Sequence, residues 1–303
     1  MERAINTMEN NSVILRSKNS NCAGCGMSIA HNLIGDALGN KIKYAIPACC
    51  AVVTPHSFPY SAYKVPVIAT TFAASAIVAS GMKAVQKMNN EEGHIIAFAG
   101  DGGTFDIGFA CLSSCAERNE DIIYFCYDNE IYGNTGAQRS SATPLGAITT
   151  TTPFGKQEHK IDIMSIIIDH TIPYAATLSI AFPDDFIRKV KTAAKIQGFR
   201  FLYLLSPCIP NWKIEPSLTI KISRLAVETG MSPLYEVFKR REYHITYKPE
   251  ILKPISEYFR LQKRFSKITK KMEKELIEHI AGDWHRLLQM EEMFPPKELL
   301  QYI

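Results

Sequence analysis

Short apolar segments and helix-like segments alternate along the chain from about residue 20 to residue 206. Each apolar segment ends at a polar or glycine-rich turn, which is typical of strands buried in a parallel sheet. Strands that alternate with helices in this way favour an α/β fold. The predicted strands lie at residues 95–99, 122–126, 171–178 and 201–205, and the predicted helices at about residues 104–118 and 185–196.

The pattern changes after about residue 216. The rest of the chain is charged and rich in Tyr and Lys, and amphipathic helical segments occupy about residues 255–293. We therefore expect two parts. Residues 1–215 form the sheet domain, and residues 216–303 form a partly helical extension that packs on the core or on a partner subunit.

The composition is that of a globular protein, with 46% hydrophobic and 21% charged residues. The net charge is +4, and no basic stripe interleaved with aromatic residues precedes residue 239, so we expect no nucleic-acid partner. The N-terminus lacks the apolar core of a signal peptide. The uncharged residues 65–82 are interpreted as a strand followed by a buried helix, not as a membrane span. We therefore predict a cytoplasmic protein without a membrane partner.

Polar and glycine residues follow two neighbouring predicted strands where each ends. The carboxyl ends of parallel strands form the ligand-binding edge of an α/β sheet. Asp101, Asn129 and the backbone carbonyl of Ile131 offer the oxygen ligands that Mg²⁺ prefers, and glycines let a diphosphate approach the backbone. This order resembles the thiamine diphosphate fingerprint, and the alternative is an ordinary turn without a ligand. The predicted cofactor-binding residues are Gly100, Asp101, Gly102, Gly103, Asn129 and Ile131.

The eight cysteines fall into two groups. Cys22 and Cys25 form a C-x-x-C motif, whereas the Cys49-Cys50 pair and Cys208 follow predicted strands. Four such thiolates suit a [4Fe–4S] cluster, while zinc with the same ligands and a redox or structural pair of thiols remain open. Strand alternation directs the side chains of Cys49 and Cys50 to opposite sides, so one of them should face a metal. The other cysteines are predicted to be small core residues: Cys111, Cys115 and Cys126.

The chain resembles the β subunit of pyruvate:ferredoxin oxidoreductase (pyruvate synthase), a member of the 2-oxoacid:ferredoxin oxidoreductase family, over nearly its whole length. The resemblance rests on four strings in order: CAGCG, GDGGTFDIG, YDNEIYGNTGAQRSSATPLGA and LLSPC. It implies a doubly wound parallel sheet with helices on both faces, which binds thiamine diphosphate and Mg²⁺. In this family the third cluster cysteine lies 25 positions after the second, which selects Cys50 over Cys49. The implied cluster ligands are Cys22, Cys25, Cys50 and Cys208.

The family activity implies the function and the partners. It is the oxidative decarboxylation of pyruvate to acetyl-CoA and CO₂, with coenzyme A as acyl acceptor and ferredoxin as electron acceptor. An α subunit would supply the pyrimidine side of the cofactor site, and γ- and δ-type subunits or domains would complete the enzyme. Asn134 resembles the family residue beside the reacting centre, although an Asn that only stabilises its turn is the alternative.

Two departures from the family pattern leave other functions open. Ala51-Val52 follows Cys50, and Ala73-Ala74 follows Phe72, where the family has polar residues. The alternatives are another 2-oxoacid or oxalate as substrate, a non-redox thiamine-dependent decarboxylase subunit, and a non-catalytic paralogue. His31, His56 and His94 are candidates for a general base, but each is interpreted as a surface or structural histidine without a catalytic role.

Overall fold

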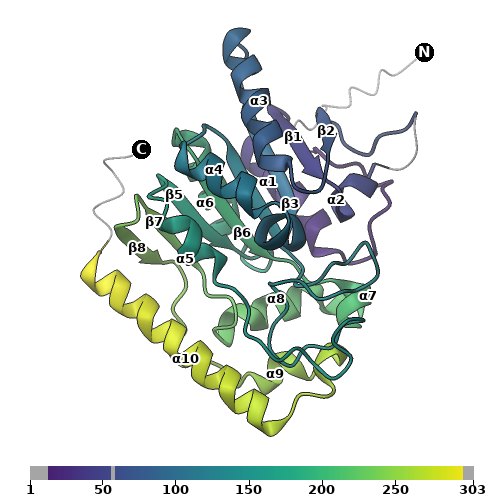
Figure 1. Ribbon diagram of the computed structural model, residues 1–303, viewed down its shortest axis with the longest axis vertical. Helices are drawn as coiled ribbons and strands as arrows, with labels where there is room; N and C mark the ends of the chain where they lie inside the picture. Colours follow the sequence, from purple (N-terminus) through teal and green to yellow (C-terminus); the bar gives the residue numbers. More distant parts are fainter. Residues whose placement is uncertain (1–12, 56–58, 296–303) are drawn as a thin grey trace, which may run out of the picture.

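The computed structural model describes residues 13–55 and 59–295. Residues 1–12, for which the absence of a signal peptide was predicted, and His56 lie outside them. The described chain forms one eight-stranded sheet with helices on both faces (Figure 1). The strands are β1 (Ile42–Pro47), β2 (Val67–Thr70), β3 (His94–Gly100), β4 (Ile123–Asp128), β5 (Tyr174–Leu178), β6 (Arg200–Leu205), β7 (Tyr235–Phe238) and β8 (Glu242–Ile245). The α-helices are α1 (Gly26–Leu38), α2 (Cys50–Val53), α3 (Ser75–Met88), α4 (Phe109–Glu117), α5 (Ile163–Ile168), α6 (Pro183–Lys195), α7 (Ile209–Trp212), α8 (Thr219–Glu228), α9 (Ser256–Phe259) and α10 (Lys270–Met293).

Six strands run parallel in the order β2-β1-β3-β4-β6-β5, and β7 and β8 continue the sheet in antiparallel pairing beyond β5. The chain leaves β1 for β2 on one side and returns to β3 on the other side, so the strand order reverses between β1 and β3. Doubly wound sheets bind ligands at this point, outside the carboxyl ends of the strands. The predicted α/β fold is confirmed.

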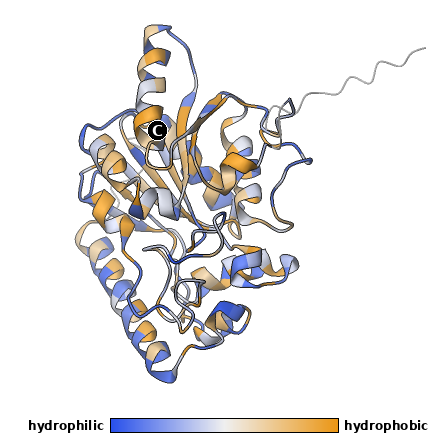
Figure 2. Ribbon diagram, turned by 45° about the vertical axis from the view of Figure 1, so that its right-hand side comes forward, coloured by the Kyte–Doolittle hydropathy of each residue, from blue (hydrophilic) through white to orange (hydrophobic). Residues whose placement is uncertain are grey.

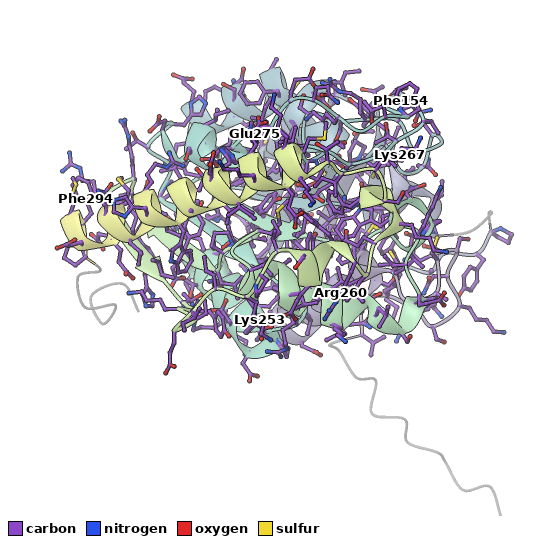
Figure 3. The ribbon with its side chains drawn as sticks, turned by 90° about the horizontal axis from the view of Figure 1, so that it is seen from below. Phe154, Lys253, Arg260, Lys267, Glu275 and Phe294 are labelled. Carbon is purple, nitrogen blue, oxygen red and sulfur yellow. The ribbon has the colours of Figure 1, made fainter. Side chains whose placement is uncertain are left out.

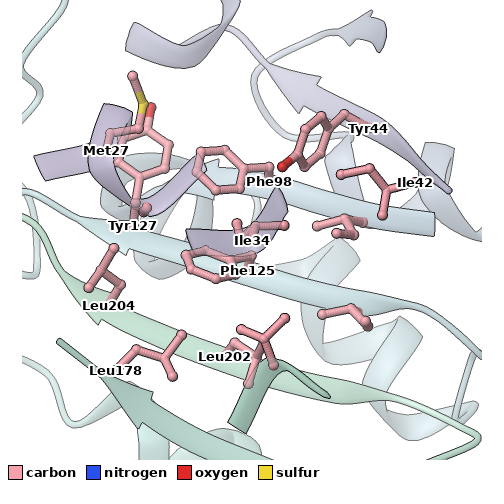
Figure 4. Packing of buried hydrophobic residues seen from close by; sticks show 14 of the residues in the cluster. Met27, Ile34, Ile42, Tyr44, Phe98, Phe125, Tyr127, Leu178, Leu202 and Leu204 are labelled. Atoms are coloured by element: carbon pink, nitrogen blue, oxygen red, sulfur yellow. The ribbon is translucent and has the colours of Figure 1, made fainter. Parts of the chain in front are cut away.

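Apolar side chains fill the space on both faces of the sheet. Helices α1 and α6 pack on one face, and α3, α4 and α5 pack on the other. On the first face Phe98 stacks with Phe125 and Tyr127, with ring centroids 5.1 and 5.0 Å apart (Figure 4). Strand β4 is buried over its whole length, which explains why its sequence is almost continuously apolar. Figure 2 shows this apolar sheet between more hydrophilic outer helices.

The C-terminal part completes the sheet and covers one end of it. Strands β7 and β8 were not predicted, because each is only four residues long; β7 lies inside the sheet with the buried Glu236, and β8 forms the edge. The helical segment predicted over residues 255–293 is divided into α9, a 3₁₀ turn at Lys263–Phe265 and the long helix α10. A separate apolar cluster that includes Trp212, Tyr258 and Phe265 joins this end to the sheet domain. Figure 3 shows α10 crossing this end of the molecule.

The uncharged residues 65–82 form β2 and the first part of α3, as predicted, but α3 is not a buried helix. It extends beyond the sheet (Figure 1), and the side chains of Val85 and Met88 are 56% and 81% exposed. Ala76 and Ala79 are its fully buried contacts with the core, and Val78 and Met82 pack against the core while partly exposed. Among residues 13–55 and 59–295, no helix combines the length and the apolar character that a membrane crossing requires.

His31 is a buried structural residue of α1, as predicted. Its two ring nitrogens lie 3.2 Å from the hydroxyl oxygens of Tyr44 and Tyr63, and the Tyr63 hydroxyl donates to the carbonyl of Ala51. Burial lowers the pKa of His31 from 6.5 to about 3. The folded protein therefore keeps the ring neutral at pH values where the unfolded chain binds a proton.

We expect His31 to make the protein less stable in mild acid. The unfolded chain takes up a proton below pH 6.5 and the folded chain only near pH 3, so the stability present at neutral pH declines as the pH falls between these values. The loss from this residue between pH 7 and pH 5 is about 2 kcal/mol. Urea unfolding at both pH values should show this decline in the wild type and a smaller one in His31→Gln. Equal declines would contradict the assignment.

Candidate functional site

The structure brings together the three predicted magnesium ligands. Strands β3 and β4 are parallel neighbours, so Asp101 and Asn129 follow them at the same edge of the sheet. The side-chain oxygen of Asn129 lies 3.0 Å from Asp101 Oδ1 and 2.6 Å from the carbonyl oxygen of Ile131. A 180° rotation of this amide would turn both contacts into hydrogen bonds. The amide can place either its nitrogen or its oxygen at this position, and with the oxygen there the three oxygens form the donor set that Mg²⁺ takes in proteins.

The charge of Asp101 also fits a bound cation. This carboxyl group is 2% exposed, and its second oxygen accepts a hydrogen bond from the hydroxyl of Ser140. Burial raises the pKa of Asp101 well above its usual range, and the neighbouring Asp128 raises it further. A divalent cation would offset both effects, because it stabilises the ionised carboxylate directly. The donor chemistry and the buried negative charge therefore fit Mg²⁺.

An ion-pair network holds the loop that carries Asn129 and Ile131. Glu130 between them has a left-handed backbone conformation, with φ of +61°, and its N–H donates to Asp128 Oδ1 at 2.7 Å. Lys160 pairs with Asp128 and with Glu130, where Nζ and Oε1 are 2.9 Å apart. Burial raises the pKa of Glu130, but the charges of Lys160 and then Arg264 outweigh burial, and its pKa lies below the usual value.

The C-terminal part also contacts this loop. Arg264 Nη2 lies 2.7 Å from Glu130 Oε2, and its guanidinium lies 3.5 Å from the centre of the Trp212 ring. Trp212 in turn donates from Nε1 to the carbonyl oxygen of Asn129 at 2.8 Å. We call Asp128, Glu130, Lys160 and Arg264 the buried charge network. This network was not predicted from the sequence. The acidic residues on both sides of Asn129 could have indicated it, because buried carboxylates need partners of opposite charge.

The glycines after β3 form a π-helical turn, Gly102–Asp106, and the helix predicted over residues 104–118 begins only at Phe109. A Cβ atom on Gly102 would lie 2.1 Å from the ring of Tyr132, and one on Gly108 would lie 2.0 Å from the carbonyl oxygen of Gly103. This close packing excludes side chains at both positions. Such π turns occur frequently at functional sites.

One small cavity joins the predicted cofactor residues to the cysteine pair. Asn134 lines it from an exposed turn, whereas Asp101 lies at a buried position. Cys50 and Phe72 border the same cavity. All predicted cofactor-binding and catalytic residues line it: Gly100, Asp101, Gly102, Gly103, Asn129, Ile131 and Asn134.

The four predicted cluster ligands also come together. Cys25 precedes α1, Cys50 begins α2 after β1, and Cys208 follows β6. Burial raises the pKa of Cys50, and the other three thiols raise it further because they lie close enough to repel its charge. Burial also raises the pKa of Cys208 to about 11, with further contributions from Cys25 and Cys22. The thiol of Cys49 raises the pKa of Cys50 as well, so these charge effects do not separate Cys50 from Cys49.

These thiols do not converge on a single metal ion. Within the described residues no group of three or more His, Cys, Asp or Glu side chains is arranged to hold one ion. Zinc would require its thiolates within about 2.3 Å of one atom, whereas a [4Fe–4S] cubane shares four thiolates among four separate irons.

The remaining cysteines differ in their surroundings from these four. Cys49 is buried, and its thiol forms a hydrogen bond with the hydroxyl group of Tyr127. Cys115 and Cys126 are buried in the core, as predicted, and Cys111 is half-buried against it.

A larger cavity of about 280 Å³ lies between α10 and the sheet. Its lining includes Tyr203, Leu276 and Trp284, and it contains none of the predicted cofactor or cluster residues. The small cavity at the strand ends is therefore the candidate site, because it joins the buried carboxylate to the cysteines.

The chain matches one protein family and is similar to several curated oxidoreductase subunits. The thiamine pyrophosphate enzyme, C-terminal TPP binding domain family matches residues 48–204, which is more than half of the chain. Ketoisovalerate oxidoreductase subunit VorB of Pyrococcus horikoshii is 43% identical, over 90% of this chain and 92% of its own. Pyruvate synthase subunit PorB of Methanocaldococcus jannaschii is 44% identical, over 82% and 87%. The chain therefore belongs to the thiamine pyrophosphate enzymes, among the subunits of 2-oxoacid:ferredoxin oxidoreductases, and the resemblance in its motifs is confirmed.

Pyruvate synthase subunit PorB of Thermotoga maritima is a further relative, 39% identical over 92% of both chains. A solved structure of 2-oxoglutarate:ferredoxin oxidoreductase from Magnetococcus marinus shares the fold, with a TM-score of 0.61 over 91% of this chain and 97% of that chain. Its sequence identity is 18%, so this similarity concerns the fold alone.

The buried charge network should contribute strongly to stability. Lys160→Met leaves Asp128 and Glu130 with one buried cation fewer, and removing one partner of a buried ion pair typically costs about 3–5 kcal/mol. Lys41→Met is the matched control, because Lys41 pairs with Glu92 in the open, where such pairs contribute less than about 1 kcal/mol. Urea unfolding of both variants at neutral pH measures the difference. Equal and small losses would contradict the network.

Proposed function

We propose that this chain is the thiamine diphosphate- and [4Fe–4S]-containing subunit of a 2-oxoacid:ferredoxin oxidoreductase. In this proposal the enzyme converts pyruvate and coenzyme A to acetyl-CoA and CO₂, and ferredoxin receives the electrons. The observation that carries the proposal is a single cavity bordered both by the oxygens of Asp101, Asn129 and Ile131 and by Cys50.

Asp101, Asn129 and Ile131 would hold Mg²⁺, and the cation would hold the diphosphate of the cofactor. Gly102 and Gly103 line the same cavity and would contact the diphosphate through their backbone. Thiamine diphosphate, when bound, supplies the electron sink for decarboxylation. Asn134 lies exposed at the same cavity, where its amide could contact the substrate.

Cys22, Cys25, Cys50 and Cys208 would hold the iron–sulfur cluster. Support comes from the charge effects of Cys22, Cys25 and Cys208 on the pKa of Cys50 and from the position of the four cysteines on three separate segments next to strand ends or helix starts. Cys50 borders the cofactor cavity, so electrons released by decarboxylation would have a short path to the cluster. A decarboxylase without electron transfer needs no such group of thiols.

Pyruvate is the proposed substrate, and a branched 2-oxoacid is the second candidate. Relatives named as pyruvate synthase subunits support pyruvate, and relatives of equal identity named as ketoisovalerate oxidoreductase subunits support the branched acid. The two acids differ in their apolar side chains, and pockets usually separate such substrates by about 1–3 kcal/mol per methylene group.

The proposal includes partner subunits in the cytoplasm. The chain offers one diphosphate-binding module, so an α subunit would supply the pyrimidine side of the site. Other subunits or domains, of γ and δ type, would bind coenzyme A and carry electrons to ferredoxin. The names of the relatives as subunits support this division.

Asp101→Ala should abolish magnesium-dependent binding of thiamine diphosphate. The substitution removes the one carboxylate among the three oxygen ligands. The two ligands that remain are neutral, so no negative charge of the ligand set would balance the cation. Asp36→Ala, on the exposed side of α1, is the control. Titration calorimetry on the assembled enzyme measures binding. Unchanged affinity in Asp101→Ala would contradict the proposed cofactor site.

The iron content tests the cluster. The anaerobically purified wild type should contain about four irons per chain, and dithionite reduction should produce the EPR signal of a reduced [4Fe–4S] cluster. Cys208→Ser should lose both, because it removes one of four ligands. Cys111→Ser, in α4, should keep them. Zinc in place of iron, or no metal at all, would refute the oxidoreductase proposal.

A further inference from the structure

Asn211 connects the cysteine group with the cofactor loop. It lies in the short helix α7, three residues after Cys208 and one residue before Trp212. Its side-chain nitrogen Nδ2 lies 3.2 Å from Cys208 Sγ and 3.3 Å from the carbonyl oxygen of Gly133. A primary amide has two N–H groups, so Asn211 can donate to the sulfur and to the carbonyl at the same time.

Gly133 is the point where the two predicted sites meet. A Cβ atom there would lie 3.1 Å from Asn211 Nδ2, 3.2 Å from Asn129 Nδ2 and 3.7 Å from Cys208 Sγ. The backbone at Gly133 therefore packs directly against the amide of a predicted magnesium ligand, against Asn211 and against a predicted cluster ligand. Both predicted sites depend on the position of this one loop.

We propose that Asn211 is a positioning residue that raises the reduction potential of the cluster by donating an N–H···S hydrogen bond to Cys208. This inference rests on the proposed function, which provides the cluster. Reduction adds one electron and increases the negative charge on the thiolates, so a donor to sulfur stabilises the reduced state more than the oxidised state. The N–H group stays on Asn211 throughout, and no proton is transferred.

The second N–H of the same amide gives the residue a geometric role. It ties Cys208 to the backbone of Gly133 and so fixes the distance between the cluster ligand and the cofactor loop. Trp212, the next residue, holds the carbonyl of Asn129 from the other side. Helix α7 thus contacts the magnesium loop and the cluster through consecutive residues.

The test is an EPR redox titration of the full chain, purified anaerobically, with dithionite as reductant. The variants are Asn211→Ala, which removes the donor, and Asn211→Asp, which keeps the shape but replaces the donor with a negative charge. Both should contain as much iron and sulfide as the wild type. At the wild-type midpoint potential, the ratio of reduced to oxidised cluster should fall by about tenfold in Asn211→Ala and further in Asn211→Asp.

Asn32→Ala, on the exposed side of α1, is the control and should keep the wild-type midpoint. An intact cluster with an unchanged or higher midpoint in both Asn211 variants would overturn this inference and leave the proposed function standing. Loss of the cluster from both variants, with the wild-type cluster intact, would overturn it as well, because the inference assigns tuning and not ligation. A wild-type chain without a cluster would refute the proposed function itself.

Discussion

The candidate site depends on how buried carboxylates are neutralised at the ends of β3 and β4. Asp128 and Glu130 flank Asn129 in the interior, and Lys160 and Arg264 supply the opposite charges. These ion pairs hold Glu130 in a left-handed conformation, which a non-glycine residue adopts only when its surroundings enforce it. The carbonyl of Ile131 can then face Asp101 and Asn129. Without the network, a run of negative charge beside Asp101 would oppose folding of this loop.

The sequence predicted the local features of this arrangement well. The ends of β3 and β4 could be located because each apolar run stops at polar or glycine residues, among them Asp101 and Asn129. Parallel pairing then brings these two strand ends to the same edge of the sheet. The neutralising cations could not be predicted. Lys160 and Arg264 are two of 34 basic residues, and tertiary packing alone brings them from distant positions to Glu130. Strand β7 depends on pairing with β5, and β8 depends on pairing with β7; the short sequences of these two strands do not specify either pairing.

For the cysteines, too, the sequence indicates the candidate ligands but does not decide which of them act together. A C-x-x-C motif and two isolated cysteines permit several ligand sets, and family resemblance was needed to choose Cys50 over Cys49. In the structure both Cys49 and Cys50 border the candidate cavity, and Cys49 also contacts the hydroxyl of Tyr127. Gly133 packs against Asn129, Asn211 and Cys208, and the Asn211 side chain links Cys208 to the Gly133 backbone, so the two candidate sites are held next to each other.

The central claim is that electrons pass from the thiamine site to a cluster held by this chain. The most direct measurement is freeze-quench EPR of the assembled enzyme, mixed anaerobically with pyruvate in the absence of coenzyme A and ferredoxin. The account predicts a reduced-cluster signal that appears together with CO₂ release and is missing in an enzyme that carries Cys208→Ser. Release of CO₂ at the same rate without reduction of any iron–sulfur cluster would contradict it.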